Sequence, residues 1–152
     1  MIIGKAGRHI SKDKALDHVA GYSLFNDGSI RDYQFKSHQW MIGKNFDATA
    51  SFGPELVTAD ELPAGAVGLR TQGRLNGEVM QDANTKDMIF DVATLVSTCS
   101  EIFALQPGDV IISGTPAGVG FARKPQIFMK QGDVFEVEVE QVGILRNTVK
   151  NE

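Results

Sequence analysis

Three side chains that could act together in chemistry lie within one short segment: Asp27, Arg31 and Gln34. Their positions follow i, i+4 and i+7 spacing, so a helical turn after Asn26-Asp27-Gly28 would place all three on one face. A carboxylate, a fixed cation and an amide on one face suit a hard metal ion beside an anionic substrate. A simpler interpretation is also open, in which Asp27 caps a short helix and Arg31 is its solvated partner.

Two further segments carry residue types suited to an anionic ligand. Gly43 lets the backbone approach closely beside Lys44, although a lone lysine is usually an ordinary surface residue. The glycine-rich segment 113–120, reading SGTPAGVG, follows a run expected to be a buried strand. Its Gly114 and Thr115 could contribute backbone N–H groups and a hydroxyl to an anion-binding nest. No Gly-Lys-Ser/Thr ends this segment, so it is not a Walker A loop, and a plain turn or bulge is the alternative.

Composition excludes several classes of function. The net charge is −4 and the Lys and Arg residues are scattered, which argues against nucleic acid as a partner. No apolar run approaches the ~20 residues that span a bilayer, and no signal peptide is visible. Cys99 is the only cysteine, so neither an intrachain disulfide nor a cysteine-based zinc site is expected. A cytoplasmic location is the simplest expectation.

The elements that must position these residues are mostly strands, and we expect residues 1–152 to form a single domain. Ser11 and Gly21 are expected to bound a helix over residues 12–20, and a strand is expected over residues 22–25. Asn76-Gly77 between residues 69–75 and 78–81 predicts a type I′ hairpin.

A longer helix is expected over residues 88–105, because its apolar residues recur at the helical period and should form one inner face: Val92, Leu95, Val96, Cys99, Ile102 and Phe103. Cys99 lies on that apolar face, so we expect a core residue rather than a nucleophile. Strands are expected over residues 1–4, 110–112, 134–140 and 144–149. The pattern predicts an α+β, mostly β fold, a mixed β-sheet roll or barrel-like sandwich.

Taken together and in order, the segments resemble the catalytic, carboxyl-terminal domain of the fumarylacetoacetate hydrolase family over almost the whole chain. Each piece is weak alone, but the ordered set is specific. The matching pieces are Ile3-Gly4-Lys5, DHVAGYSLFNDGSIRDYQ (17–34), GKNFD (43–47), Asn76-Gly77-Glu78 with Gln81, residues 85–90, PGDVIISGTPAGVG (107–120), and GDVFEVEVE (132–140) with Gly143 and Asn147.

The resemblance implies a set of site residues and a reaction class. Asp27 matches a ligand of a divalent metal, Mg²⁺ or else Mn²⁺ or Ca²⁺. Arg31, Lys44 and Thr115 match catalytic residues, and Arg31, Gln34, Lys44, Gly114 and Thr115 match substrate-binding residues. The implied activity is hydrolysis of a C–C bond in a 2-oxo or β-diketo acid through a metal-stabilised enolate. The alternatives are an isomerase or decarboxylase of the 2-hydroxyhepta-2,4-diene-1,7-dioate type, acting in aromatic catabolism. The resemblance also implies a homodimer.

The sequence departs from the family in one respect. Two metal-binding glutamates precede the strand that continues into Ile3-Gly4-Lys5 in the family, and a His and a Glu lie on a lid upstream. None of these has a counterpart here, so we expect the chain to be the carboxyl-terminal part of a longer enzyme. A single carboxylate holds Mg²⁺ poorly, which predicts weak metal binding by residues 1–152. A non-catalytic remnant that keeps only the fold is the alternative.

Overall fold

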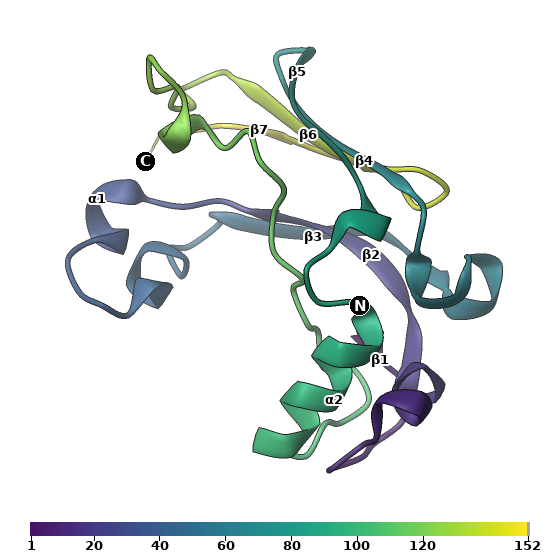
Figure 1. The fold of residues 1–152 in the computed structure, drawn as a ribbon. Coiled ribbons are helices and arrows are strands. Elements are labelled where there is room, and N and C mark those ends of the chain that lie inside the picture. Colours follow the sequence, from purple (N-terminus) through teal and green to yellow (C-terminus); the bar gives the residue numbers. More distant parts are fainter. Residues whose placement is uncertain (152) are drawn as a thin grey trace.

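Two antiparallel sheets form the body of the molecule. The computed structural model describes residues 1–151. One sheet has the strand order β1-β2-β3 and the other the order β5-β4-β6-β7. Figure 1 shows them as two layers, with α2 on the same side as β1. The α+β, mostly β class expected from the sequence is therefore confirmed. The bounds are β1 Ile2–Ile3, β2 Val19–Asp27, β3 Ala50–Thr58, β4 Arg70–Leu75, β5 Glu78–Asn84, β6 Val134–Val139, β7 Gly143–Thr148, α1 Arg31–Gln34 and α2 Val92–Ile102.

The β4–β5 hairpin forms where its turn sequence predicts it. Asn76 and Gly77 have φ values of 52° and 84°, so both central residues adopt the left-handed conformation of a type I′ turn. Asn and Gly tolerate this conformation best, and the turn fixes the register Leu75↔Glu78. Because β4 also pairs with β6, the position of β4 relates the registers of β5 and β6 within the same sheet.

The hydrophobic core lies where α2, the N-terminal strand and the two sheets meet. Val96 of α2 and Ala15 are fully buried, and Ile3 of β1 is almost so. Cys99 packs against this core as expected, which is a structural rather than a reactive position. The buried cluster comprises Ile3, Ile10, Ala15, Val19, Tyr22, Leu24, Leu62, Ala66, Leu69, Val92, Val96, Leu105, Val142 and Leu145.

Two helix predictions need correction. Within residues 12–20 the helix is a 3-10 helix that covers only Lys12–His18, because Val19 already belongs to β2. Ser11 makes no side-chain cap. The long helix is shorter than expected because Asp91 caps it at Val92 and Phe103 leaves it in an extended conformation.

Two further predictions about burial and strands are wrong. Ile102 is 72% exposed and Phe103 is 49% exposed, so neither belongs to the inner face of α2. Residues 110–112 form no strand, because only a single bridge links Val110 to Ile2. The remaining predicted strands are present.

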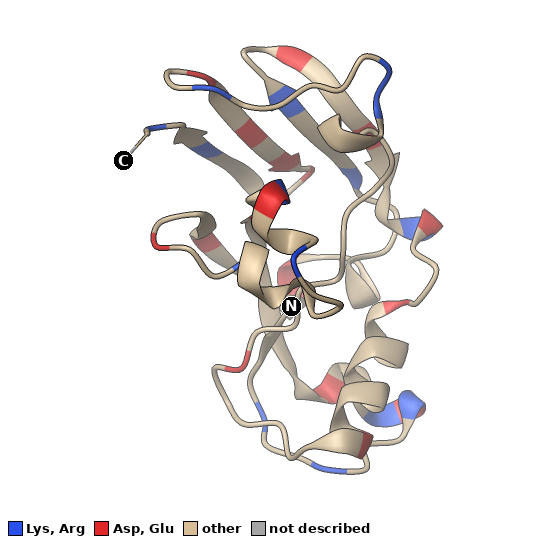
Figure 2. Cartoon of the chain, turned by 90° about the vertical axis from the view of Figure 1, so that its left-hand side faces the viewer, with Lys and Arg blue, Asp and Glu red and all other residues tan. Residues whose placement is uncertain are grey.

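The two faces of the larger sheet differ in character. On β6, Val137 and Val139 pack against the core, while Glu136 and Glu138 lie on the opposite face. Figure 2 shows bands of both charge signs on neighbouring strands of this sheet. Apolar and charged side chains thus alternate along β6, and its carboxylates are paired to arginines.

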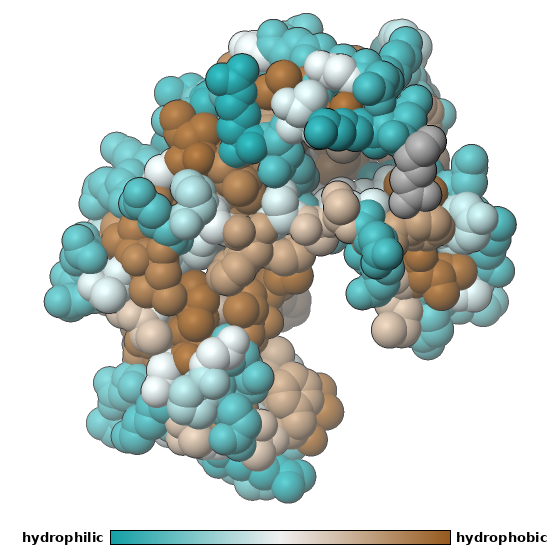
Figure 3. Space-filling model, turned by 180° about the vertical axis from the view of Figure 1, so that it is seen from behind, coloured by the Kyte–Doolittle hydropathy of each residue, from teal (hydrophilic) through white to brown (hydrophobic). Residues whose placement is uncertain are grey.

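The molecule is deeply hollowed on its other side. In Figure 3 a lobe on the right is separated by a wide hollow from the lower part of the molecule. It corresponds to the α1 side of Figure 1 and is called the α1 lobe below; it contains α1 and the 3-10 helix Trp40–Gly43. Brown, apolar side chains line much of the hollow. None of the helices within residues 1–151 has the length and apolar character needed to cross a bilayer.

Candidate active site

Asp27 and Lys44 form the centre of the predicted site. Asp27 is the last residue of β2, and Lys44 follows the 3-10 helix Trp40–Gly43. The Lys44 Nζ lies 2.7 Å from Asp27 Oδ2, and the two side chains are 26% and 40% exposed. The N-cap of α1 is Ile30, so the interpretation of Asp27 as a helix cap is wrong. Asp27 and Arg31 also do not share a helix face, because Asp27 belongs to the strand.

Arg31 is the first residue of α1, and its side chain is held by Gln34, the last residue of the same helix. Its Nη1 donates a hydrogen bond of 2.7 Å to Gln34 Oε1, and Gln34 is only 2% exposed. A buried amide oxygen that accepts from a guanidinium fixes the position of the cation. The structure therefore makes Gln34 a partner of Arg31, and direct contact of Gln34 with a substrate stays a prediction.

Gly43 lets the lysine segment pack directly on α1. A Cβ atom at Gly43 would lie 2.7 Å from Gln34 Cα, a distance that real side chains do not tolerate. The Gly43 carbonyl also accepts a 2.9 Å hydrogen bond from the Ile30 N–H. This close approach, expected from the glycine, places Lys44 next to the end of β2.

The glycine-rich segment reaches α1 through an aromatic side chain. Phe121 lies on the short 3-10 helix Gly120–Ala122 that follows this segment. The Arg31 Cζ is 5.0 Å from the centre of the Phe121 ring, and the Phe35 ring is 5.4 Å from it. Stacking on an aromatic ring further restricts the guanidinium. In Figure 1 the green segment accordingly rises between α2 and the α1 lobe.

Thr115 is held by β5 rather than by the other predicted site residues. Gln81 Nε2 lies 2.8 Å from Thr115 Oγ1 and 2.8 Å from the Pro116 carbonyl oxygen. Arg123 donates to the carbonyl oxygens of Gly118 and Met80 and so fastens the other end of the loop. No local sequence pattern predicts that Gln81 and Arg123 hold this loop by hydrogen bonds. Gln81 is noticed in the sequence only because it lies in a segment that resembles the family.

The described residues do not by themselves fit a divalent metal ion. Residues 1–151 contain no cluster of three His, Cys, Asp or Glu side chains arranged to hold a metal. Asp27 offers one carboxylate, and the Lys44 ammonium already pairs with it. Hard cations need several oxygen ligands, so no chemical step is assigned to a metal on these residues.

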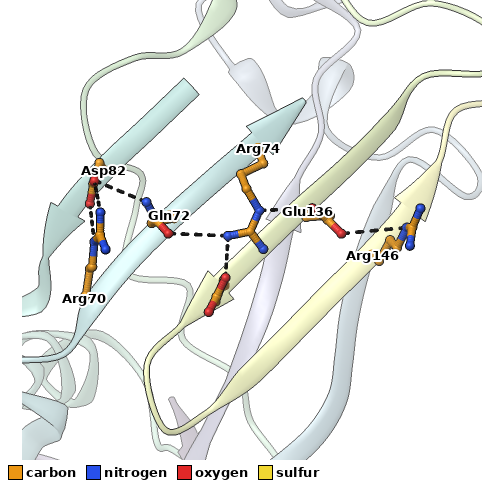
Figure 4. Close-up of polar contacts among 7 residues, drawn as sticks. Arg70, Gln72, Arg74, Asp82, Glu136 and Arg146 are labelled. Atoms are coloured by element: carbon orange, nitrogen blue, oxygen red, sulfur yellow. Dashed lines mark hydrogen bonds and ion pairs between the residues drawn. The ribbon is translucent and has the colours of Figure 1, made fainter. Parts of the chain in front are cut away.

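Surface depressions on the larger sheet lie away from this site. Depressions of about 210 Å³ and 360 Å³ are lined mostly by polar residues of β4, β6 and β7 and of the turns next to them. Figure 4 shows that these side chains are engaged with one another: Arg74 with Glu136 and Glu138, and Arg70 with Asp82. The charged groups of Arg70 and Arg74 are thus already paired with carboxylates, so we place the candidate site at Asp27 and Lys44.

The fold and this site define the class of the protein. The chain matches the family "Fumarylacetoacetate (FAA) hydrolase C-terminal" over residues 1–150, and it belongs to the fumarylacetoacetate hydrolase family. It is 43% identical over 151 residues to a human protein described as "Oxaloacetate tautomerase FAHD2A, mitochondrial", covering 98% of this chain and 48% of the human protein. The chain spans about half the length of the curated relatives it matches. The cytoplasmic location stays a prediction, because this relative is named as mitochondrial.

Solved structures agree with this assignment. A fumarylacetoacetate hydrolase from psychrophilic Exiguobacterium antarcticum superposes with a TM-score of 0.95 at 42% identity, covering 99% of this chain and 54% of that one. A fumarylpyruvate hydrolase from Pseudomonas aeruginosa, in complex with Mn²⁺ and pyruvate, gives a TM-score of 0.88 at 32% identity, covering 99% of this chain and 63% of that one. The family thus contains tautomerases, isomerases and hydrolases.

Proposed function

We propose that this chain binds a 2-oxo acid and stabilises its enolate, with keto–enol tautomerisation of a 2-oxo dicarboxylic acid such as oxaloacetate as the reaction. The observation that carries the proposal is the Lys44–Asp27 pair at 2.7 Å, which places a partly exposed ammonium in the α1 lobe. Arg31 adds a second cation, held in place by Gln34 and Phe121.

The chemistry follows from the charges. When a solvent base takes a proton from the carbon next to the 2-oxo group, negative charge develops on the oxo oxygen, which then takes a proton from solvent to give the enol. Fixed cations and hydrogen-bond donors aimed at that oxygen stabilise the enolate more than the ketone, which lowers the barrier. In this proposal Arg31 and Lys44 receive the carboxylate and the enolate oxygen, and Gly114 and Thr115 bound the ligand from the opposite loop.

The predicted C–C bond hydrolysis is the second candidate, since it passes through the same enolate. It is supported by the 42% identity to the Exiguobacterium antarcticum hydrolase. Hydrolysis also requires a base that activates water, whereas tautomerisation needs only proton movement between carbon and oxygen. The name of the human relative also favours tautomerisation.

Lys44→Met tests the proposal. We expect it to lower kcat/KM for oxaloacetate tautomerisation, followed by the ultraviolet absorbance of the enol, by roughly 10²–10³-fold, the usual cost of removing one enolate-stabilising group. Arg31→Gln should act in the same direction. Lys14→Met, at an exposed lysine of the Lys12–His18 helix, is the matched control and should leave the rate unchanged.

The same assay separates the alternatives. An unchanged rate in Lys44→Met would contradict the proposed site. Release of pyruvate from an acylpyruvate, with no acceleration of tautomerisation, would favour hydrolysis. If neither reaction is accelerated with Mg²⁺ or Mn²⁺ present, the chain is the non-catalytic remnant considered from the sequence.

A further inference from the structure

We propose that Gln81 is a positioning residue that fixes Thr115 as a hydrogen-bond donor toward an anionic oxygen of the ligand. The proposal rests on the function proposed above. It assigns a part to a β5 residue that lies 34 positions before Thr115 in the sequence and that no local pattern singles out.

The Pro116 carbonyl decides which group donates and which accepts in the contact between Gln81 and Thr115. That carbonyl oxygen can only accept a hydrogen bond, so the side of the Gln81 amide that faces it must be the NH₂ group. The same nitrogen lies 2.8 Å from Thr115 Oγ1. One amide hydrogen therefore goes to each partner, and the Thr115 oxygen acts as the acceptor. This network settles the orientation of an amide whose N and O atoms otherwise look alike.

Accepting from Gln81 leaves the Thr115 hydroxyl hydrogen available. Thr115 is exposed, and among residues 1–151 its side chain takes part in no hydrogen bond other than the one from Gln81. Carboxylate and enolate oxygens need donors around them, and a hydroxyl free to donate supplies one. A hydroxyl that instead donated to a protein acceptor would present lone pairs and repel such an anion.

The Gln81 side chain is confined by the strand beside it. Gln81 pairs with Gly73 of β4, and a Cβ atom at Gly73 would lie 2.8 Å from Gln81 Oε1. Gly73 is buried, so the amide occupies the space that a side chain would fill. Gly118, whose added Cβ would lie 2.2 Å from the Met80 carbonyl oxygen, brings the loop equally close to β5. The close approach of the backbone at Gly73 and at Gly118 therefore confines both Gln81 and the loop that carries Thr115.

Calorimetric titration with pyruvate tests the proposal in the isosteric variant Gln81→Glu. A glutamate in this position can only accept, so it should draw the Thr115 hydrogen inward and lose the Pro116 contact. We expect a loss of pyruvate affinity of roughly tenfold or more. Gln81→Met, which keeps the shape but removes the donor, should lose less. Gln106→Glu adds the same charge at an exposed glutamine and should leave the affinity unchanged.

A double-mutant cycle separates positioning from a general structural effect. In a Thr115→Val background the hydroxyl is gone, so Gln81→Glu should lower pyruvate affinity no further. Thermal melting of each variant identifies any loss of folding, and Gln81→Met carries the test if Gln81→Glu unfolds. Additive losses, or equal affinities for Gln81→Glu and Gln106→Glu, would overturn the proposal.

Failure of the proposed function gives a different result. If Thr115→Val, Lys44→Met and Arg31→Gln weaken pyruvate binding but the Gln81 variants do not, the function stands and the positioning role is wrong. If the unaltered chain binds no pyruvate, or binds it independently of Lys44 and Arg31, both proposals fall.

Discussion

At the scale of single residues, the pairing of Asp27 with Lys44 decides what the site can hold. The 2.7 Å contact neutralises the one carboxylate that the resemblance assigns to a metal. A divalent ion on Asp27 would have to compete with an ammonium group and would find no second carboxylate in a suitable cluster within residues 1–151. In the proposed function these residues therefore bind an anion, with Arg31 on the adjacent turn.

We therefore expect the chain to bind Mg²⁺ or Mn²⁺ only weakly, with no saturation at micromolar concentrations in a calorimetric titration. The reason is that hard cations need several oxygen ligands in a defined geometry. Asp27→Asn should then leave the titration almost unchanged. Micromolar affinity that disappears in Asp27→Asn would show that the donor set is more complete than these residues indicate.

At the scale of elements, the N-terminus of α2 depends on one side chain. Asp91 Oδ1 accepts hydrogen bonds of 2.7 Å from the Thr94 N–H and 2.6 Å from the Thr94 hydroxyl. Its other oxygen lies 3.0 Å from Lys12 Nζ, which ties α2 to the Lys12–His18 helix. The hydrogen bonds from Thr94, followed by the contact with Lys12, lower the pKa of Asp91 from 3.8 to about 2. The cap is therefore made by the charged form.

Asp91→Ala should lower the free energy of unfolding by about 1 kcal/mol at neutral pH, the usual cost of losing an N-cap. Because the folded-state pKa is depressed, this contribution is present above about pH 4 and is lost as the pH falls toward about 2. Urea unfolding at several pH values measures it, with Asp87→Ala at an exposed position as control. A difference that persists at pH 2 would contradict this account.

At the scale of the whole molecule, apolar packing joins the two sheets, and a polar contact between β3 and β7 adds to it. Leu24 of β2 is 3% exposed and Leu145 of β7 is 7% exposed, and both belong to the same core cluster. Ser51 of β3 donates a 2.5 Å hydrogen bond to Asn147 Oδ1 of β7. The end of β2 that carries Asp27 is therefore held by packing between the two layers.

Leu24→Ala should cost about 2–5 kcal/mol of stability, because it removes buried surface and leaves a cavity between the layers. Leu56→Ala provides a matched control, since Leu56 lies on β3 and is 49% exposed. We expect the control to change stability by less than about 0.5 kcal/mol. Equal destabilisation of the two variants in chemical unfolding would show that the core is not located where we place it.

The sequence by itself determined the features that depend on a few neighbouring residues. Asn76-Gly77 determined the hairpin because only certain residues adopt two positive φ values in succession. The apolar period within residues 88–105 predicted the presence of α2 and the packing of Cys99 against the core, although not the ends of the helix. The ordered segments likewise determined the family.

Only the tertiary structure decided which distant side chains meet. It placed Asp27 at the end of a strand rather than on a helix, paired it with Lys44, and joined Gln81 to Thr115. It also left Ile102 exposed although its spacing fits the apolar face. Local propensity depends on backbone sterics over a few residues, whereas these contacts depend on strand register and on the close approach allowed by Gly43, Gly73 and Gly118.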